Sequence, residues 1–226
     1  MKMIMIYLLT SLSLLKWYIK KEMSKGKFLD LAYVDQCFRN SLKEEDDVII
    51  EAYLDGYNEL VKFLNLIGTV FSFVSSDVKS KIKVMEKLRT GEDAIYYESF
   101  KKMMKYELEA GLHDKNDFVS GSRTMLRLHR GLDFIRLFLK RLSDCEENFN
   151  TCTSCQMSYN ETLAEFHPWY IRKAATLAMH ALPGRIDLMI KVRWKDLYFC
   201  MLRINSKSTG PILKILSPFE SYIIYE

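Results

Sequence analysis

The sequence predicts an all-α protein. Only nine Gly and four Pro occur in 226 residues, which leaves few turns and favours long helices over many short strands. Apolar residues make up 49% of the chain and aromatic residues 13%, enough for a large core. Apolar residues also recur at helical spacing, and the clearest stripe consists of Leu128, Leu132, Ile135, Leu139 and Leu142. At this length we expect one domain, with two possible.

The N-terminal half of the chain predicts three helices. The first covers Phe28–Leu42, where Phe28, Leu31, Val34, Phe38 and Leu42 fall near helical spacing. An acidic turn follows at Glu44–Asp47, and the pattern then predicts a helix over Val48–Leu66. Gly68 marks a break before a third helix at Val70–Leu88.

The second half predicts four more helices. After a turn at residues 90–93, a segment rich in Met and Tyr predicts a helix over Ala94–Leu112. The polar residues 113–121 form a loop, and the stripe of leucines predicts a helix over Ser122–Leu142. A long polar loop is expected at Ser143–Gln156. Two helices, Ser158–Phe166 and Tyr170–Leu182, then lie on either side of Pro168, which bends or restarts the chain.

Both ends of the chain differ from this helical body. Residues 1–22 form an apolar and basic leader, residues 23–192 the domain, and residues 193–226 a divergent segment without clear helical periodicity. In the leader, Lys16 interrupts the apolar run before the ~20 residues that a membrane span needs. No small-residue cleavage site follows it. We therefore expect an upstream extension or a weakly membrane-associating helix.

Charge and cysteine content narrow the classes of function. The formal net charge is +4, and the leader, with four lysines and one glutamate, accounts for three of these charges. The remaining charge is too small for a broad basic face, so we expect no nucleic-acid partner. Five cysteines at irregular spacing argue against a secreted disulfide framework. Zinc or redox chemistry at Cys152 and Cys155 is an alternative, but a zinc knuckle needs four ligands, so we expect ordinary thiols, no metal and no cofactor.

Two charged pairs interrupt otherwise apolar helical segments. Asp77 and Lys81 are spaced i, i+4, as are Arg123 and Arg127, so each pair lies on one side of its helix. The segment F-H-P-W-Y-I-R-K adds His167. Taken singly, these are typical of a surface ion pair, a solvated face and a packing motif at a helix start.

Taken together, the same residues predict an anion site. Three cations accompany one acid, which indicates an external anion as the missing partner. A phosphate between Lys81, Arg123 and Arg127 would accept charge-assisted hydrogen bonds. An ionised Asp77 can only accept hydrogen bonds, which suits an amide N–H and a hydroxyl as donors, and His167 can donate a hydrogen bond to a carbonyl. Phosphate, amide, hydroxyl and carbonyl together describe a phosphorylated ceramide headgroup.

Acid–base catalysis by the same histidine and aspartate beside a phosphate clamp is the enzymatic alternative. The sequence shows no Ser or Cys nucleophile with a matched base, and no H-E-x-x-H motif or carboxylate cluster for a metal. We therefore expect a protein that is not an enzyme.

The chain resembles the glycolipid transfer protein superfamily, and most closely its ceramide-1-phosphate transfer branch. The resemblance runs from about Phe28 to Val192 and is carried by Y-N-E-L-V-K-F-L-N-L-I-G-T-V-F-S-F-V-S-S-D-V-K-S-K-I-K-V-M-E-K-L-R, G-S-R-T-M-L-R-L-H-R-G-L and S-Y-N-E-T-L-A-E-F-H-P-W-Y-I-R-K-A. It implies two helix layers that sandwich a lipid. Departures from the family pattern are the leader and the segment after about Val192, where the family's final helix is not recognisable.

The resemblance also implies residue roles. Asp77 would hold the sphingoid amide and hydroxyl, and His167 the acyl amide oxygen. Lys81, Arg123 and Arg127 would bind the phosphate. Trp169 would lie near the membrane-docking surface, with Lys83 and Lys87 as weaker candidates for contact with anionic lipid.

Two positions indicate the branch. Glycolipid carriers resemble this chain but have Asn in place of Lys81 and Trp in place of Arg127. The cations here favour a phosphate over a sugar. We expect a monomeric, cytoplasmic, peripherally membrane-associated carrier that takes ceramide 1-phosphate or a related sphingolipid and meets membranes transiently. The alternatives are glycosphingolipid transfer and a lipid sensor or adaptor of the same fold that does not transfer.

Overall fold

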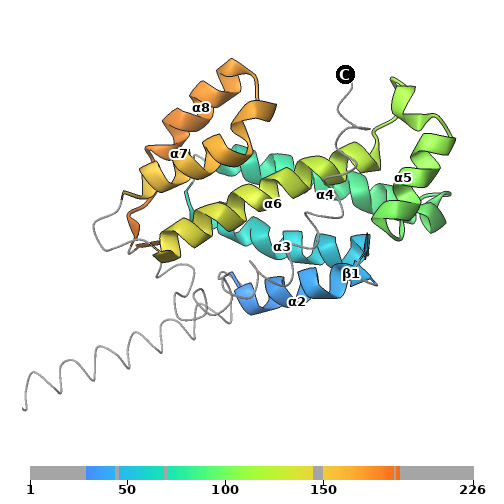
Figure 1. Cartoon of the computed structure of the whole chain (residues 1–226), viewed down its shortest axis with the longest axis horizontal. Coiled ribbons are helices and arrows are strands. Elements are labelled where there is room, and N and C mark those ends of the chain that lie inside the picture. Colours follow the sequence, from blue (N-terminus) through green and yellow to red (C-terminus); the bar gives the residue numbers. More distant parts are fainter. Residues whose placement is uncertain (1–28, 44–45, 69–70, 145–149, 186, 189–226) are drawn as a thin grey trace, which may run out of the picture.

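The computed structural model describes residues 29–43, 46–68, 71–144, 150–185 and 187–188 (Figure 1). The α-helices in this part of the chain are α2 (Leu31–Ser41), α3 (Ile50–Leu66), α4 (Ser72–Thr90), α5 (Phe100–Glu109), α6 (Gly121–Asp144), α7 (Thr151–Thr162) and α8 (Trp169–Met179). Short 3-10 turns are η2 (Ala94–Tyr97), η3 (Leu112–Asp114) and η4 (Ala164–Phe166). Two strands, β1 (Leu42–Lys43) and β2 (Asp47–Val48), pair antiparallel between α2 and α3.

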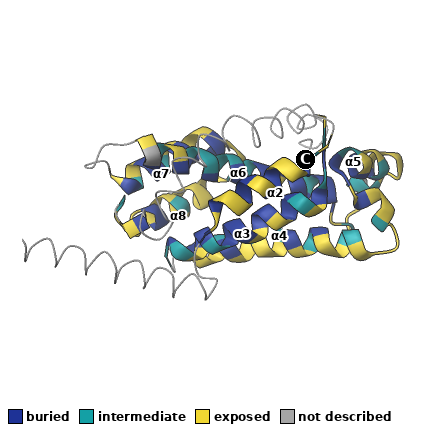
Figure 2. Cartoon of the chain, turned by 90° about the horizontal axis from the view of Figure 1, so that it is seen from below, coloured by how far each residue is buried: buried dark blue, intermediate teal, exposed yellow. Residues whose placement is uncertain are grey.

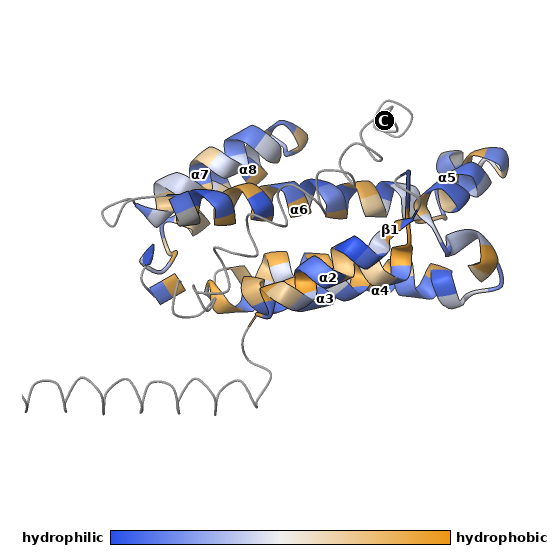
Figure 3. Ribbon diagram, turned by 60° about the horizontal axis from the view of Figure 1, so that its bottom comes forward, coloured by the Kyte–Doolittle hydropathy of each residue, from blue (hydrophilic) through white to orange (hydrophobic). Residues whose placement is uncertain are grey.

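The helices form two layers. In Figure 3, α2, α3 and α4 lie together on one side and α6, α7 and α8 on the other, with α5 at one end. Helix α3 packs on both α2 and α4, and α6 packs on α4 and α7. This arrangement confirms the all-α, two-layer helical sandwich. The atypical C-terminal segment that accompanied this prediction lies outside the described residues.

The core lies between the layers, where the inward faces of the helices are buried (Figure 2). The predicted stripe on α6 is confirmed, because its members are all 4% exposed or less. From the opposite layer, Phe63 of α3 meets Phe138 of α6 with ring centroids 6.5 Å apart. The buried stripe therefore fixes the rotation of α6 about its axis, and polar side chains can lie on the other faces of that helix.

The first three helices agree with the sequence patterns to within a few residues. Helix α2 begins after Asp30, whose side chain accepts a hydrogen bond from the backbone N–H of Tyr33 (3.0 Å) and caps the helix. Helix α3 ends at Leu66, and Gly68 follows with a φ of 129°, a conformation that favours glycine. The predicted break between α3 and α4 is confirmed at that residue.

The prediction of a single helix over Ala94–Leu112 was wrong. The chain forms η2, then an extended residue at Ser99, and then α5. Ser99 pairs with Ile49 as an isolated β-bridge, and the backbone N–H of Ile50 donates to the carbonyl of Glu98 (3.1 Å). These bonds to a distant segment replace the bonds that a continuous helix would make.

The prediction of a polar loop over Ser143–Gln156 was also wrong in its second half. Helix α7 begins at Thr151, because the side chain of Asn150 accepts from the backbone N–H of Cys152 (2.8 Å) and caps the new helix. Cys152 and Cys155 therefore lie in the first turns of a helix.

The leader, residues 1–22, and the segment 193–226 lie outside the described residues, and the domain limits at 23 and 192 stay predictions. None of the described helices is both long enough and apolar enough to cross a bilayer.

One ionisable group lies at the interface between α3 and α6. His129 is 4% exposed, and its Nδ1 lies 3.4 Å from the hydroxyl of Tyr53. Burial, with smaller contributions from Arg136 and Arg130, lowers the pKa of His129 to about 3. The folded protein therefore holds this imidazole neutral across the physiological range.

We predict that His129 makes stability fall with pH below neutrality. Between pH 6.5 and about 3 the unfolded chain binds a proton here that the folded chain does not, so stability is complete above 6.5 and declines as the pH drops. The slope approaches about 1.4 kcal/mol per pH unit. Urea unfolding at several pH values measures it. His129→Asn should give a flatter profile, whatever its stability at neutral pH, and equal slopes in the two proteins would contradict the assignment.

Candidate functional site

Helix α4 presents the first charged pair. The Nζ of Lys81 lies 2.5 Å from Oδ1 of Asp77, one turn earlier on the same helix. The Asp77 side chain is 62% exposed, whereas that of Lys81 is 21% exposed. An exposed pair of this kind adds well under ~1 kcal/mol to stability, so a ligand can rearrange it at little cost.

The second pair lies on α6, which packs against α4 in the antiparallel sense (Figure 1). Leu88 marks the register, because its Cδ1 would lie 3.1 Å from a Cβ added to Gly121. Two helical turns are about seven residues, or about 10.5 Å along a helix axis. Two turns back from Leu88 on α4 is Lys81, and two turns forward from Gly121 on α6 is Leu128. Lys81 is therefore level with Arg127, the neighbour of Leu128, to within about one residue.

Both arginines stand beside buried apolar residues of α6. Met125, Leu126 and Leu128 are all 2% exposed or less, whereas Arg127 is exposed and Arg123 is half-buried. The backbone N–H of Arg123 donates to the hydroxyl of Ser120 just before the helix (3.1 Å). The arginines thus lie one turn apart on a helix that is packed into the core.

His167 joins the α4 pair from the turn between η4 and α8. Its Nδ1 lies 2.8 Å from the hydroxyl of Tyr159 on α7. Burial lowers the pKa of His167, Asp77 opposes this shift and Lys81 adds to it. Asp77 and Lys81 are thus near enough to this imidazole for their charges to act on its pKa.

Trp169 opens α8 and is 63% exposed. The Nζ of Lys173 lies 5.1 Å from its ring centroid, and Tyr170, which is 57% exposed, lies edge-on to it at 6.1 Å. Exposed aromatic rings with a cation beside them suit a lipid–water boundary, where each ring meets both phases. Lys83 and Lys87 are exposed on α4.

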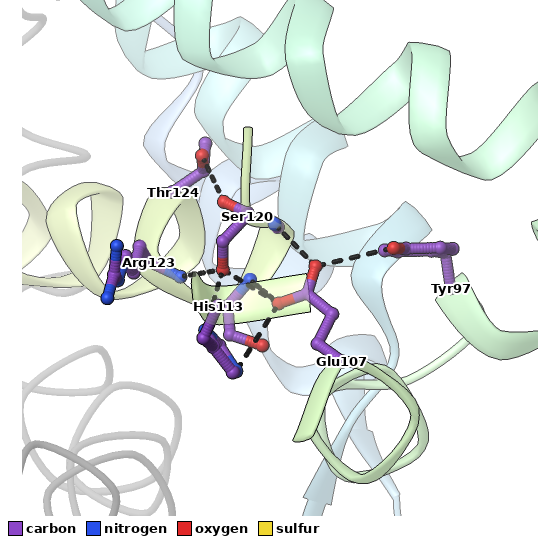
Figure 4. A network of polar contacts seen from close by, with 8 residues as sticks. Tyr97, Glu107, His113, Ser120, Arg123 and Thr124 are labelled. Carbon is purple, nitrogen blue, oxygen red and sulfur yellow. Dashed lines mark hydrogen bonds and ion pairs between the residues drawn. The ribbon is translucent and has the colours of Figure 1, made fainter. Parts of the chain in front are cut away.

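A buried carboxylate anchors the start of α6 (Figure 4). The side chain of Glu107 on α5 is fully buried and accepts from the backbone N–H groups of Gly121 (2.6 Å) and Ser122 (3.0 Å). The hydroxyls of Ser120 (2.7 Å) and Tyr97 (3.3 Å) also donate to it. The carboxylate adds to the cap that the Ser120 hydroxyl provides for the N–H of Arg123, and satisfies two further donors that the helix itself leaves open.

Sequence reasoning missed three residues that support the site. Glu107 resembled any acid on an amphipathic helix, and Tyr159 resembled a core aromatic. Arg130, whose guanidinium lies 3.6 Å from the ring centroid of Phe166, resembled a third surface cation. Phe166 directly precedes His167, so this stack ties α6 to the histidine turn. Each partner lies outside the residue's own helix, and spacing within one helix carries no signal of it.

The cysteine motif shows free thiols. Cys152 is half-buried with its Sγ 3.5 Å from Nδ1 of His180, and Cys155 is buried, which raises its pKa to about 12. Across the part of the chain that the structure describes, no group of three or more His, Cys, Asp or Glu side chains is placed to hold a metal. Cys145 lies outside the described residues.

Comparison with known proteins identifies the fold. The glycolipid transfer protein family matches residues 48–193. The chain belongs to this family. The resemblance seen in the sequence motifs is thereby confirmed, and the two layers are the family's architecture.

The relatives point to one branch of the family. A ceramide-1-phosphate transfer protein of Danio rerio is 47% identical over 159 residues, which cover 69% of this chain and 75% of that protein. The apo crystal structure of the mouse ceramide-1-phosphate transfer protein superposes with a TM-score of 0.77 at 33% identity, covering 85% of this chain and 96% of that one. The human protein in complex with 2:0 ceramide-1-phosphate gives a TM-score of 0.73 at 34% identity, covering 86% and 95%.

We predict that Gly121→Ala lowers the free energy of unfolding by about 1–3 kcal/mol. The added Cβ would lie 2.7 Å from Sδ of Met103 and 3.1 Å from Oε1 of Glu107, so both side chains must shift at the helix start. Denaturant unfolding at neutral pH measures the change.

Gly131→Ala is the matched control on the same helix. Its Cβ meets only the Tyr57 hydroxyl, at 3.6 Å, which is ordinary contact. Alanine also favours a helix interior by up to about 1 kcal/mol, so this variant should be neutral or stabilised. Equal losses at the two positions would remove the argument that the close packing of Met103 and Glu107 requires glycine at residue 121.

Proposed function

We propose that this protein binds ceramide 1-phosphate and carries it between membranes without converting it chemically. The observation that supports this most directly is the register of α4 and α6, which sets Lys81 level with Arg127. Family membership supplies the fold, and these cations are the residues that distinguish a phosphate from a sugar.

The phosphate is assigned to Lys81, Arg123 and Arg127. The two arginines offer planar, forked donors that match phosphate oxygens in pairs, and the lysine adds a compact charge. Because Arg123 is half-buried on a rigid helix, its donors are partly oriented before the ligand arrives. The solvent-facing Arg127 suits the outer side of the phosphate.

The sphingoid amide and its hydroxyl are assigned to Asp77 and His167. The carboxylate of Asp77 accepts from the ligand N–H and O–H, whereas a neutral His167 donates one N–H to the acyl carbonyl. Burial keeps His167 neutral by lowering its pKa, which preserves this division into acceptor and donor. An ester-linked phospholipid has no amide N–H, so Asp77 discriminates against it.

The apolar chains of the lipid explain why a carrier is needed. A buried CH₂ is worth ~0.8 kcal/mol, so moving a chain of ~16 carbons into water costs roughly 12 kcal/mol. Apolar residues from Phe63 to Val74 and from Leu126 to Leu139 are the proposed walls that replace the bilayer. In the structure Phe63, Ile67 and Phe71 of the first segment are buried in the core, whereas Phe73 is 55% exposed.

Membrane contact is assigned to Trp169, with Lys83 and Lys87 as weaker contributors toward anionic lipid. We place the protein in the cytoplasm as a monomer that docks peripherally and transiently, and we assign it no enzymatic activity. The family and its Danio rerio member are both named as transfer proteins, and this supports the proposal of a carrier without enzymatic activity.

Selective transfer between vesicles tests the proposal. Fluorescent ceramide 1-phosphate should move from donor to acceptor vesicles faster than glucosylceramide, with no release of inorganic phosphate. Equal or faster glycolipid transfer would overturn the choice of ligand. Tight retention of lipid without flux would favour a sensor, and phosphate release would favour an enzyme.

Arg127→Leu tests the proposed binding of the phosphate by Lys81, Arg123 and Arg127. Losing a charge-assisted, paired contact with phosphate should reduce ceramide 1-phosphate transfer by at least tenfold, with thermal stability unchanged because the side chain is exposed. Lys140→Leu removes an exposed positive charge from the same helix, away from the site, and should leave transfer unchanged. Matching losses in both variants would indicate a general effect of net charge.

Trp169→Ala tests docking. We expect vesicle binding, measured by co-sedimentation, to fall about tenfold, because the ring supplies exposed amphipathic area at the boundary. Ile95→Ala removes a side chain that is equally exposed (64%) in η2, beside α5 at the other end of the molecule. Equal losses in the two variants would refute a docking surface centred on Trp169.

A further inference from the structure

Tyr159 is held against the imidazole that faces the α4 charges. Its hydroxyl lies 2.8 Å from Nδ1 of His167, and the two ring centroids are 5.6 Å apart. Tyr159 is only 4% exposed, and Phe134 of α6 packs edge-on against it with centroids 6.4 Å apart. The hydroxyl therefore has a fixed direction, toward a single nitrogen of His167.

The protonation states of the two groups restrict their hydrogen bond to one of two directions. Burial raises the pKa of Tyr159 and lowers the pKa of His167, so both are neutral at physiological pH. A neutral imidazole carries one N–H and one lone pair, and a phenol can donate to the lone pair or accept from the N–H. If Nδ1 accepts from Tyr159, the proton of His167 must be on Nε2.

The tautomer determines what the site can recognise. With the proton on Nε2, His167 donates toward a ligand carbonyl, while the Asp77 carboxylate accepts from an amide N–H. With the proton on Nδ1, Nε2 would present a lone pair instead, and a carbonyl oxygen facing it would be left unpaired and repelled. The orientation of an amide between these two groups depends on this one proton.

We propose that Tyr159 is a positioning residue of the headgroup site, whose hydroxyl holds His167 in the Nε2–H tautomer so that it donates to the amide carbonyl of the sphingolipid. The ligand part of this inference rests on the proposed function. The tautomer itself is a property of the chain without ligand.

The tautomer is measured directly by ¹⁵N NMR of the full-length protein with labelled histidines and no lipid. The chain has four histidines, and the signal that disappears in His167→Gln identifies the relevant one. We expect an unprotonated Nδ1 and a protonated Nε2 in the native protein, and a mixture of tautomers in Tyr159→Phe. A protonated Nδ1 in the native protein would overturn the proposal.

A double-mutant cycle on transfer separates positioning from simple packing. Tyr159→Phe keeps the buried ring and removes only the hydroxyl, and we expect about a tenfold loss of ceramide 1-phosphate transfer. In a His167→Gln background the same change should alter transfer by less than about twofold. A full further loss in that background would show that Tyr159 acts only on the fold, and would sink the proposal.

Tyr53→Phe is the matched control, because it removes another buried hydroxyl that faces Nδ1 of a histidine, His129, at 3.4 Å in the core. It should lower thermal stability without lowering ceramide 1-phosphate transfer, and a tenfold loss of transfer here would mean that any buried hydroxyl has this effect. If the native protein transfers no ceramide 1-phosphate, the proposed function fails, and the NMR result still decides the role of Tyr159.

Discussion

The carboxylate of Glu107 sets the residue at which α6 begins, and the rest of the molecule depends on that start. Its oxygens accept from the first two backbone N–H groups of the helix and from Ser120. Each residue of an α-helix turns the chain by about 100°, so a start displaced by one residue would swing the leucine stripe out of the core. It would also turn Arg127 away from its exposed position. The contact between Glu107 and the start of α6 is therefore needed both for the core and for the site.

Helix α6 can contribute to both the core and the site because its apolar and charged side chains lie on different faces. Leu126 and Leu128 are buried, and Arg127 between them is exposed. Packing on one face makes the helix rigid, and rigidity limits the side-chain entropy that the arginines lose when they bind an anion. The stack of Arg130 on Phe166 extends this rigidity to the turn that carries His167. The site thus draws on α4, α6 and the η4–α8 turn, and α6 together with Tyr159 of α7 sets their relative positions.

Periodicity and spacing within single helices were enough to predict the all-α class and the charged pairs of the candidate site, whereas the two layers were implied by the family resemblance. The stripe from Leu128 to Leu142 is an intrinsic property of one helix, so the sequence carries it completely. Ser99 shows where this kind of reasoning stops. Its extended backbone is stabilised by Ile49, fifty residues earlier, and its own neighbours favour a helix. Glu107 and Tyr159 were missed for the same reason, because each acts through a hydrogen bond to another element. The helix start at Thr151 differs, since Asn150 is a good N-cap and its signal was present but hidden in a polar stretch.

The Asp77–Lys81 pair can meet two parts of a ligand without separating. Lys81 has three donors and directs one of them to Oδ1 of Asp77, which leaves others for a phosphate and leaves the second carboxylate oxygen for an amide N–H. The two charges act on His167 in opposite directions, so the net effect of the pair on its protonation is small compared with that of burial. The imidazole can therefore stand beside a cation and an anion and remain neutral. A neutral imidazole is useful to the site only if its single proton is on the correct nitrogen, and the hydroxyl of Tyr159 supplies that constraint.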